Sequence, residues 1–571
     1  MSETTFVDGA TASVVHNYLL SAAEEMRTTL VRTAFNPVIY EVLDFGISIY
    51  DADLNLISEA PGLTFFLGAN DYAISKAVEY VGVDNLDEGD VVLMNYPFWN
   101  SAHSYDATLF APVFCGTGAE RERPFAYLCI RAHWMDLGAK DPGYVLDSTD
   151  VHQEGLLFPG TKVFKKYEPN HEILELIRFN SRMPDLVFGD LHAQVSAIRT
   201  GERRMKEVVE KFGTGVVTEV TRRLFEEGER TTRAALARLP QGSWTAVDYA
   251  DGDWNTGEPL RMQCTVTIAD GEMTVDFVGS HGTAVGPVNI PFGSTIAMCK
   301  VALKSLTSPD EPSNAGHARP LTVLAEPGNL FHAVYPAPTF TQWTSIVAFE
   351  LIFKALAQAM PDRLGASSGG DMPGFMMVGT HPDTGRMFAV SNNEVVGWGG
   401  APDHDGADAT IHLSESIVRN TPIEVLEQKT TMLIERLEMR TDAGGPGRHR
   451  GGVGIERHIR FRGAGEFLMV VQKTKTAPWP VGAGRESEPN RIVVFPGTDR
   501  ERDISTERVP VEPGDLIVVR TAGGAGHGDP LARDPEAVRA DVLDGYVSRE
   551  AALADYGVEI DERGEITAVR R

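Results

Sequence analysis

The sequence predicts a multidomain α+β protein, with mixed sheets, long helices in its first half and a glycine-rich, β-dominated last third. Three observations favour this class. The chain has 571 residues, a length that suits roughly three or four domains. Helix-like and strand-like periodicities alternate through the first half. Glycines and short apolar runs of strand length fill the last third, as in 444–461, 491–497 and 514–530.

One long helix and several strands are expected in the first 190 residues. Apolar residues at a 3–4 spacing predict a helix over 11–35. Residues 43–58 alternate, turn at Asp51-Ala52-Asp53 and alternate again, which is typical of a β-hairpin. Further strands are expected within 87–98, 106–114 and 124–133.

Helical periodicity returns in the middle of the chain, over 189–213 and 218–239, with Gly213 and Gly215 near the break. Short strands are then expected, followed by helices at about 292–306 and 341–360 and by one or two short helices in the charged tail 534–571. We expect three domains: an N-terminal α+β domain at 1–210, a middle α/β region at 211–435 and a C-terminal β-rich region with a short helical tail at 436–571.

The charge of the chain argues against two classes of function. Acidic residues number 80 and basic residues 52, which gives a net charge of −28. Such a surface repels phosphate backbones and anionic lipid, so we expect neither nucleic-acid nor membrane-surface binding. The sequence shows no signal peptide and no apolar run of about eighteen residues, so no membrane span is expected.

The cysteines indicate a reducing compartment. Cys115, Cys129, Cys264 and Cys299 form no CxxC pair and lie in or beside apolar runs. We therefore expect buried, reduced thiols and a cytoplasmic location.

Several motif-like segments are weaker signals. The phosphate-loop pattern GxxxxGK[ST] is absent, and Asp529 stands where a dinucleotide-binding loop at 523–530 would need its third glycine. The GxSxG match around Ser367 follows a predicted helix, whereas a nucleophile elbow follows a strand. The acidic loop 392–412 is either a solvated turn region or the border of a site. Residues 448–450 suggest either an anion-binding nest or a surface turn.

Two histidine–aspartate pairs stand at the ends of predicted strands. "NSAHSYDATLF" (100–110) contains His103 and Asp106, and "CIRAHWMDLG" (129–138) contains His133 and Asp136. Residues three apart on a regular strand point to opposite faces, so His103 and Asp106 converge only in a loop or a single helical turn. If the two strands pair, His133 comes near that loop.

Two imidazoles and one carboxylate suit a divalent cation, and three protein ligands leave a position open for water or substrate. Asp44 is a candidate for a further ligand, and Asp136 for orienting an imidazole or accepting a proton. The donor set admits zinc, manganese or iron. The ion would polarise a carbonyl or lower the pKa of a bound water. The alternative is that each pair forms a surface hydrogen bond.

Beyond these pairs, nearly the whole chain resembles the hydantoinase B/oxoprolinase family. The family includes subunits of ATP-dependent hydantoin and lactam hydrolases and is similar to subunits of acetone and acetophenone carboxylases. The segments that carry the resemblance are 43–60, 89–114, 131–143, 152–163, 189–204, 285–292, 444–454 and 523–538.

The resemblance implies a metal site at His103, Asp106 and His133, with Asp44 as a further ligand candidate. It also implies a larger hydantoinase A-type partner subunit that binds ATP, which agrees with the missing phosphate loop. The chain departs from the family pattern at Asn95-Tyr96-Pro97-Phe98, where NDPY is frequent, and at Trp134, where a second histidine is frequent. The aromatic rings of Phe98, Trp99 and Trp134 suit either a bulkier carbonyl substrate or burial in a core.

Three functions remain open at this point. In the first, the partner phosphorylates the carbonyl of a hydantoin, lactam or oxoproline-like cyclic amide, which is then hydrolysed at the metal site, with Asp136 as base or orienting group. In the second, the chain is a subunit of an ATP-dependent ketone carboxylase. In the third, it is a non-catalytic scaffold subunit with a structural metal, although structural sites commonly use cysteine.

Overall fold

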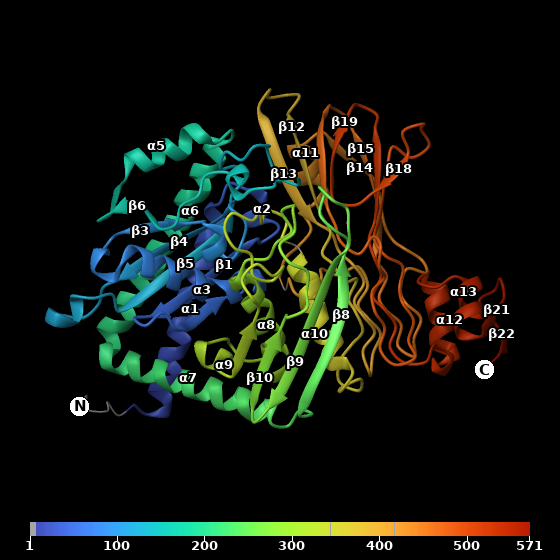
Figure 1. The fold of residues 1–571 in the computed structure, drawn as a ribbon, viewed down its shortest axis with the longest axis horizontal. Coiled ribbons are helices and arrows are strands. Elements are labelled where there is room, and N and C mark those ends of the chain that lie inside the picture. Colours follow the sequence, from blue (N-terminus) through green and yellow to red (C-terminus); the bar gives the residue numbers. More distant parts are fainter. Residues whose placement is uncertain (1–6, 343, 416, 571) are drawn as a thin grey trace. The chain divides into compact units, whose positions relative to one another are not determined.

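The computed structural model describes residues 7–342, 344–415 and 417–570. The chain divides into two compact units. Unit 1 comprises Met1–Ser243, Thr267–Asp276 and Asn289–Gln342, and unit 2 comprises Trp244–Val266, Phe277–Val288 and Trp343–Arg571. The division into domains at 1–210, 211–435 and 436–571 stays a prediction. The mixture of helices with several antiparallel sheets confirms the predicted fold class (Figure 1).

Unit 1 is built on a seven-stranded sheet with the order β2-β1-β5-β4-β3-β6-β7. The pairings of β1 with β2 and with β5 are antiparallel, which confirms the predicted hairpin. Strand β5 is buried along its whole length, and its residues from Ala126 to Ile130 form an apolar run without alternation. The strands are β1 (Phe45–Asp51), β2 (Leu56–Ala60), β3 (Val91–Met94), β4 (Asp106–Val113), β5 (Ala126–His133), β6 (Thr161–Lys165) and β7 (Glu168–Pro169).

Helices cover both faces of this sheet (Figure 1). Helix α3 (Thr64–Val81) packs on one face, where Phe110 and Cys129 belong to its hydrophobic core. On the other face, α1 (Gly9–Thr33) and α6 (Pro184–Phe212) pack together. The positive φ of Gly213 ends α6 before α7 (Thr214–Leu236) begins. The shorter helices are α2 (Pro37–Tyr40), α4 (Pro97–Asn100), α5 (His171–Asn180), α8 (Phe292–Thr307) and α9 (Ala315–Ala318), with 3₁₀ turns at Val83–Asn85, Gly118–Arg121 and Val151–Glu154.

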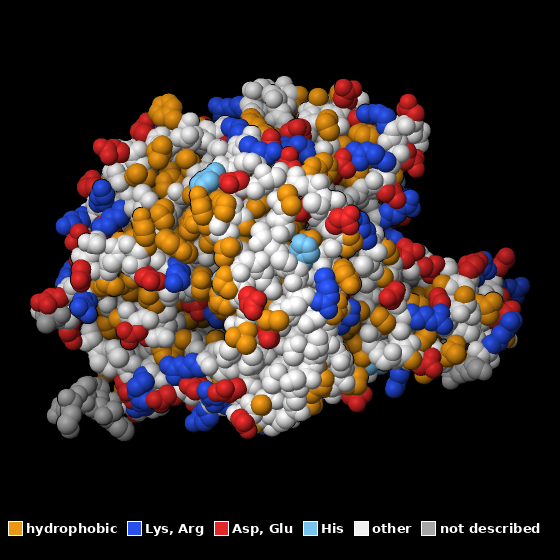
Figure 2. All heavy atoms as spheres, in the orientation of Figure 1, with side chains coloured by type: hydrophobic (Ala, Val, Ile, Leu, Met, Phe, Trp, Pro, Cys, Tyr) orange, Lys and Arg blue, Asp and Glu red, His pale blue; other side chains and the backbone are white. Residues whose placement is uncertain are grey.

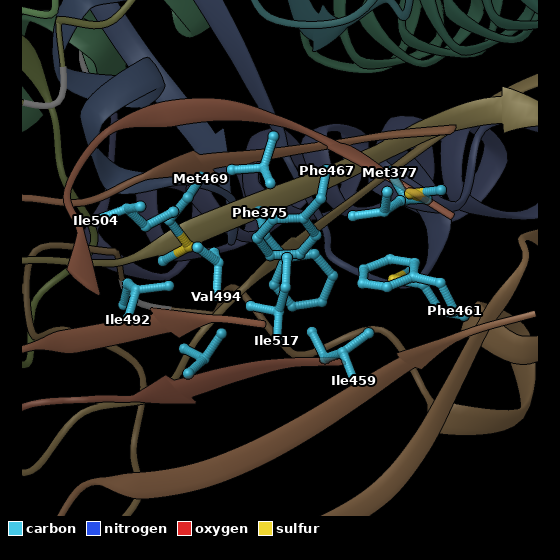
Figure 3. Close-up of a cluster of buried hydrophobic side chains, with 14 of the residues drawn as sticks. Phe375, Met377, Ile459, Phe461, Phe467, Met469, Ile492, Val494, Ile504 and Ile517 are labelled. Atoms are coloured by element: carbon cyan, nitrogen blue, oxygen red, sulfur yellow. The ribbon is translucent and has the colours of Figure 1, made fainter. Parts of the chain in front are cut away.

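A β-sandwich forms the core of unit 2. Its two sheets have the orders β13-β12-β16-β19 and β14-β15-β20-β17-β18. Figure 3 shows Phe375 and Phe467 side by side in the hydrophobic core that the sheets share, with Ile459 and Ile517 from the second sheet. The strands are β12 (Gly374–Thr380), β13 (Met387–Asn393), β14 (Met432–Met439), β15 (Ile455–Phe461), β16 (Gly465–Val470), β17 (Arg491–Val494), β18 (Arg502–Ile504), β19 (Glu507–Val511) and β20 (Leu516–Arg520).

The remaining elements include a four-stranded sheet with the order β11-β10-β9-β8. The predicted short helices of the tail are α12 and α13, and the tail ends in a hairpin of β21 and β22 that the sequence pattern did not predict. The bounds are β8 (Gly242–Ala250), β9 (Leu260–Ala269), β10 (Glu272–Asp276), β11 (Leu321–Leu324), α10 (Thr344–Ala357), α11 (Ile423–Lys429), η4 (Pro530–Ala532), α12 (Pro535–Asp544), α13 (Arg549–Tyr556), β21 (Val558–Ile560) and β22 (Ile566–Val569).

The glycine-rich segments of unit 2 pack backbone against backbone. Gly524 donates its N–H to the carbonyl of Gly452 at 2.9 Å, and Gly452 donates to the carbonyl of Trp398 at 2.8 Å. A Cβ on Gly524 would lie 1.8 Å from the carbonyl oxygen of Trp398. Only glycine permits such close approach, so residues 521–528 form no regular strand although the neighbouring β20 does.

Basic side chains are scattered among acidic ones on the face shown in Figure 2. No helix within the described ranges combines the length and the hydropathy that crossing a membrane requires. All four cysteines are buried and free, as the sequence predicts.

Candidate metal centre

Asp106 and His133 are direct partners across two neighbouring strands. Strand β4 begins at Asp106, strand β5 ends at His133, and the antiparallel register pairs these two residues. His133 Nδ1 lies 3.0 Å from Asp106 Oδ1. The pairing of the two predicted strands is therefore what brings the second histidine to the first pair.

His103 reaches the same place from a turn. The N–H of Asp106 donates to the carbonyl of His103 at 3.1 Å, which closes a tight turn immediately before β4. Ser101, in the left-handed region at φ 62°, reverses the chain after α4. Within this turn the i, i+3 pair converges, and His103 Nε2 lies 3.5 Å from Asp106 Oδ2.

Ligand atoms of His103, Asp106 and His133 all lie within 4.8 Å of one another. The three side chains are buried, with exposed fractions of 5%, 2% and 1%. The structure thus brings together three of the four residues that the sequence singled out as metal ligands.

Asp44, the fourth predicted ligand, immediately precedes β1. Its carbonyl accepts the N–H of His133 at 3.4 Å. Burial raises the pKa of the Asp44 carboxyl, His133 lowers it, and the charge of Asp106 raises it further. Asp44 therefore lies close to the group without belonging to the three side chains within 4.8 Å. Leu43 before it has a left-handed φ of 67°, which is strained for a bulky residue.

The two imidazoles differ electrostatically. Burial lowers the pKa of His103 to about 4, so its ring is neutral near pH 7. Burial also lowers the pKa of His133, but the hydrogen bond to Asp106 and the charges of Asp106 and Asp44 outweigh it, and the pKa is raised overall. A neutral ring supplies a nitrogen lone pair, which a cation requires.

Two buried polar atoms support the fit of a cation. Among the described residues, neither His133 Nε2 nor Asp44 Oδ1 has a hydrogen-bond partner. Buried polar groups are nearly always satisfied, so such atoms need an explanation, and an ion is one. Two imidazoles with one or two carboxylates form a donor set that zinc, manganese and iron accept.

Aromatic rings enclose the histidines. The ring of Phe340 stacks on His103, with centroids 4.8 Å apart and planes 8° apart. Tyr105 and Tyr144 contact His133 edge-on or tilted. Trp134 points elsewhere: it is fully buried and donates its N–H to Gln194 at 2.8 Å. The departure from the family pattern at position 134 is thus part of the core.

Asp136, the predicted base or orienting group, is fully occupied by other partners. Its Oδ1 accepts from the Tyr105 hydroxyl at 3.1 Å and from the Arg182 guanidinium at 2.8 Å. The backbone N–H of Gly138 also donates to Oδ1, and that of Arg182 donates to Oδ2. This geometry favours a positioning role for Asp136, which holds Tyr105 next to the histidines.

Glu154 and Phe340 are residues of the site that sequence reasoning missed. The Glu154 carboxylate accepts the backbone N–H groups of Thr339 at 2.8 Å and Phe340 at 3.1 Å, and the Ser148 hydroxyl at 2.8 Å. It thereby holds Phe340 in place over His103. Burial raises the pKa of Glu154 to about 8. Its only sequence signal was its position within the family-like segment 152–163.

The segments that gave the weaker sequence signals lie in unit 2, where Ser367, Arg450 and His412 are all buried. Ser367 is buried and precedes β12, as expected for a chance match. Arg450 is buried and pairs with Asp408 at 2.9 Å and Asp541 at 3.0 Å, so it is not part of an open anion nest. His412 of the acidic loop lies 3.1 Å from Glu350.

Comparison with known proteins identifies the family. The model of the hydantoinase B/oxoprolinase family matches residues 8–530, and the chain belongs to this family. A protein named as the B-type component of a D-/L-hydantoinase in Pseudomonas sp. (strain NS671) is 30% identical over 588 residues, which cover 98% of this chain and 96% of that protein.

Solved structures agree with this family. The crystal structure of the ATP-dependent caprolactamase from Pseudomonas jessenii matches with a TM-score of 0.90 and 26% identity, covering 99% of this chain and 98% of that one. The nucleotide-free structure of acetone carboxylase matches with a TM-score of 0.86 and 18% identity, covering 97% and 81% respectively, which shows likeness of fold alone.

Proposed function

We propose that this chain is the metal-holding subunit of a hetero-oligomeric, ATP-dependent enzyme that hydrolyses a cyclic amide of the hydantoin, lactam or oxoproline class. The observation that carries the proposal is the buried group of His103, Asp106 and His133, with ligand atoms within 4.8 Å of one another. The hydantoinase and caprolactamase relatives support the reaction class and the existence of a partner subunit.

The partner in this proposal is a hydantoinase A-type subunit that binds ATP and phosphorylates the amide carbonyl. Phosphorylation makes the carbonyl oxygen part of a good leaving group and stabilises the negative charge that develops on that oxygen. This chain has no GxxxxGK[ST] motif, which is consistent with ATP being bound by the partner.

The residues of this chain would hold and orient the cation. His103 and His133 contribute nitrogen donors, Asp106 contributes a carboxylate that also contacts both rings, and Asp44 is available as a second carboxylate. When bound, a divalent ion polarises a carbonyl or lowers the pKa of water. Phe340 covers one face of His103 and excludes water there, while Asp136 positions Tyr105.

The test is reconstitution with the partner. The co-purified complex is analysed for metal, then incubated with ATP and with lactams, hydantoins and ketones in turn. We expect ATP consumption with a cyclic amide and a ring-opened amino acid as product. Incorporation of labelled bicarbonate with a ketone would instead identify a carboxylase. Loss of folding together with turnover after metal removal would identify a scaffold with a structural metal.

A further inference from the structure

Unit 1 contains a cavity of about 290 Å³ that the candidate metal centre does not use. Its wall comes from β2, α3, α8 and α9 and from the loop that joins the last two helices. Leu56, Leu67, Val301 and Ala318 provide apolar surface. Lys300 and Lys304 provide positive charge, and Glu59, Asp71 and Glu311 provide negative charge. A cavity of this size and lining suits a compact molecule with an apolar body and one polar group.

The two lysines of the cavity are already engaged by the protein. Lys300 pairs with Asp71 and donates to the carbonyl of Gly68 at 3.2 Å. Lys304 donates to the carbonyls of Ser308 and Glu311 and to the Ser308 hydroxyl at 3.1 Å. An ammonium group has three protons, so Lys304 has none left for a ligand. The cavity is therefore a poor site for an anion.

Glu59 is a carboxylate of the cavity wall that retains hydrogen-bonding capacity. It lies on the edge strand β2, where side chains alternate between faces. Ser58 faces α1, because its hydroxyl donates to the carbonyl of Leu19, and Glu59 therefore points to the opposite side, where it lines the cavity. The Ser313 hydroxyl donates to its carboxyl. A carboxylate accepts about four hydrogen bonds, so further donors can bind.

We propose that this cavity binds a small molecule carrying a primary ammonium group on a short aliphatic chain. The ammonium lies at the Glu59 carboxylate, and the chain lies against Leu56, Leu67 and Val301. A charge-assisted hydrogen bond gives the ammonium its preference over a neutral hydroxyl. This site is separate from the candidate metal centre and does not depend on the function proposed above.

The pH dependence of binding follows from the groups that face Glu59. The pKa of Glu59 is raised to about 7. Burial is the main cause, and the charge of Asp71 adds to it, while the Ser313 hydrogen bond and the charges of Lys300 and Lys304 oppose it. The pKa of His317, bonded to Glu311, lies below its usual value through burial. An alkylammonium stays protonated in this range, so affinity rises about tenfold between pH 6 and pH 8 as Glu59 ionises.

The experiment is isothermal titration of hexylammonium chloride into the purified full-length chain at pH 8. We expect saturable binding that weakens at least about tenfold in Glu59→Gln, since one charge-assisted contact is lost. 1-Hexanol, with the same chain and no charge, is expected to bind more weakly than hexylammonium. Glu79→Gln, at an exposed position of α3 outside the cavity, is the matched control and should bind the probe as the wild type does.

Ala318→Phe adds a ring to the cavity wall and leaves Glu59 unchanged in the sequence, so it tests the proposal if Glu59→Gln does not fold. It should abolish binding. The proposal is overturned if the wild type shows no saturable binding at millimolar probe, if Glu59→Gln binds with unchanged affinity, or if binding survives in Ala318→Phe.

Discussion

Asp106 Oδ1 and His133 Nδ1 lie 3.0 Å apart across the β4–β5 pair, and His103 Nε2 lies 3.5 Å from the second oxygen of the same carboxylate. One carboxylate therefore contacts both imidazoles. Because β4 and β5 are fully buried strands of the central sheet, its register fixes Asp106 and His133, while the tight turn before β4 brings His103 to them. Rigid elements hold a site more accurately than loops do.

Replacing His103 with alanine should remove the bound metal and the turnover of the complex, because one of three close donors is lost. Helix content by circular dichroism and association with the partner should be unchanged. His404→Ala, at an exposed position of unit 2, is the control. Metal analysis that finds the wild-type stoichiometry in His103→Ala would contradict the assignment.

Replacing Phe340 with alanine should destabilise the protein and weaken metal binding together. Phe340 is fully buried, and truncating such a ring typically costs about 3–5 kcal/mol. Loss of the stack also frees His103 to move. Phe461→Ala, in the core of unit 2, should lower the thermal midpoint similarly but leave zinc affinity intact in a competition assay with a fluorescent chelator. Equal zinc affinities in the two variants would refute a positioning role for Phe340.

Asp136→Asn separates positioning from base catalysis. The carboxylate bonds Tyr105 and Arg182, so the variant should lose about 1.5–3 kcal/mol of stability, the usual value for hydrogen bonds to a charged group. Metal stoichiometry should be retained. Thermal unfolding and turnover are measured side by side. A large loss of turnover at wild-type stability would show instead that Asp136 acts as the base.

The stability of the protein should depend on pH through Glu154. Its pKa is about 8 in the folded protein and 4.5 in the reference state, so the folded chain holds the proton more tightly. This contribution is fully present below pH 4.5 and is lost as the pH rises through about 8. The thermal midpoint should therefore fall less between pH 5 and pH 8 in Glu154→Gln than in the wild type. Parallel curves would exclude Glu154 as the titrating group.

Gly524→Ala should prevent correct folding of the glycine-rich part of unit 2. The added Cβ would lie 1.8 Å from the carbonyl oxygen of Trp398 and 2.5 Å from the backbone nitrogen of Gly399, and backbone atoms cannot move aside as a flexible side chain can. The loss should exceed about 4 kcal/mol. Gly9→Ala, where nothing lies within 4 Å, is the control and should fold normally. Soluble yield and limited proteolysis report the difference, and a well-folded Gly524→Ala would contradict this packing.

The sequence predicts those features that depend on the local pattern of apolar and polar residues. The helices at 11–35 and 189–213, the hairpin at 43–58 and the strands around Asp106 and His133 follow from apolar periodicity, and pairing those two strands is enough to bring the candidate ligands together. Phe340 and Glu154 carry no such signal, because Phe340 reaches His103 through a loop held by a carboxylate far away in the chain.

Other features depend on tertiary contacts that no local pattern encodes. The strand order of the seven-stranded sheet places β5 between β1 and β4, which sequence order does not suggest. Glycines 451, 452 and 524 suggest β structure by composition, yet they pack backbone to backbone without forming a ladder. The role of Asp136 is decided by Arg182, which lies in the short loop between α5 and α6.

X-ray absorption spectroscopy of the metal-loaded chain would examine the proposed coordination itself. We predict about one ion per chain, bound by two imidazole nitrogens and one or two carboxylate oxygens, with one imidazole lost in His133→Ala. An ion bound through sulfur, or an unchanged spectrum in His133→Ala, would contradict the proposed metal centre.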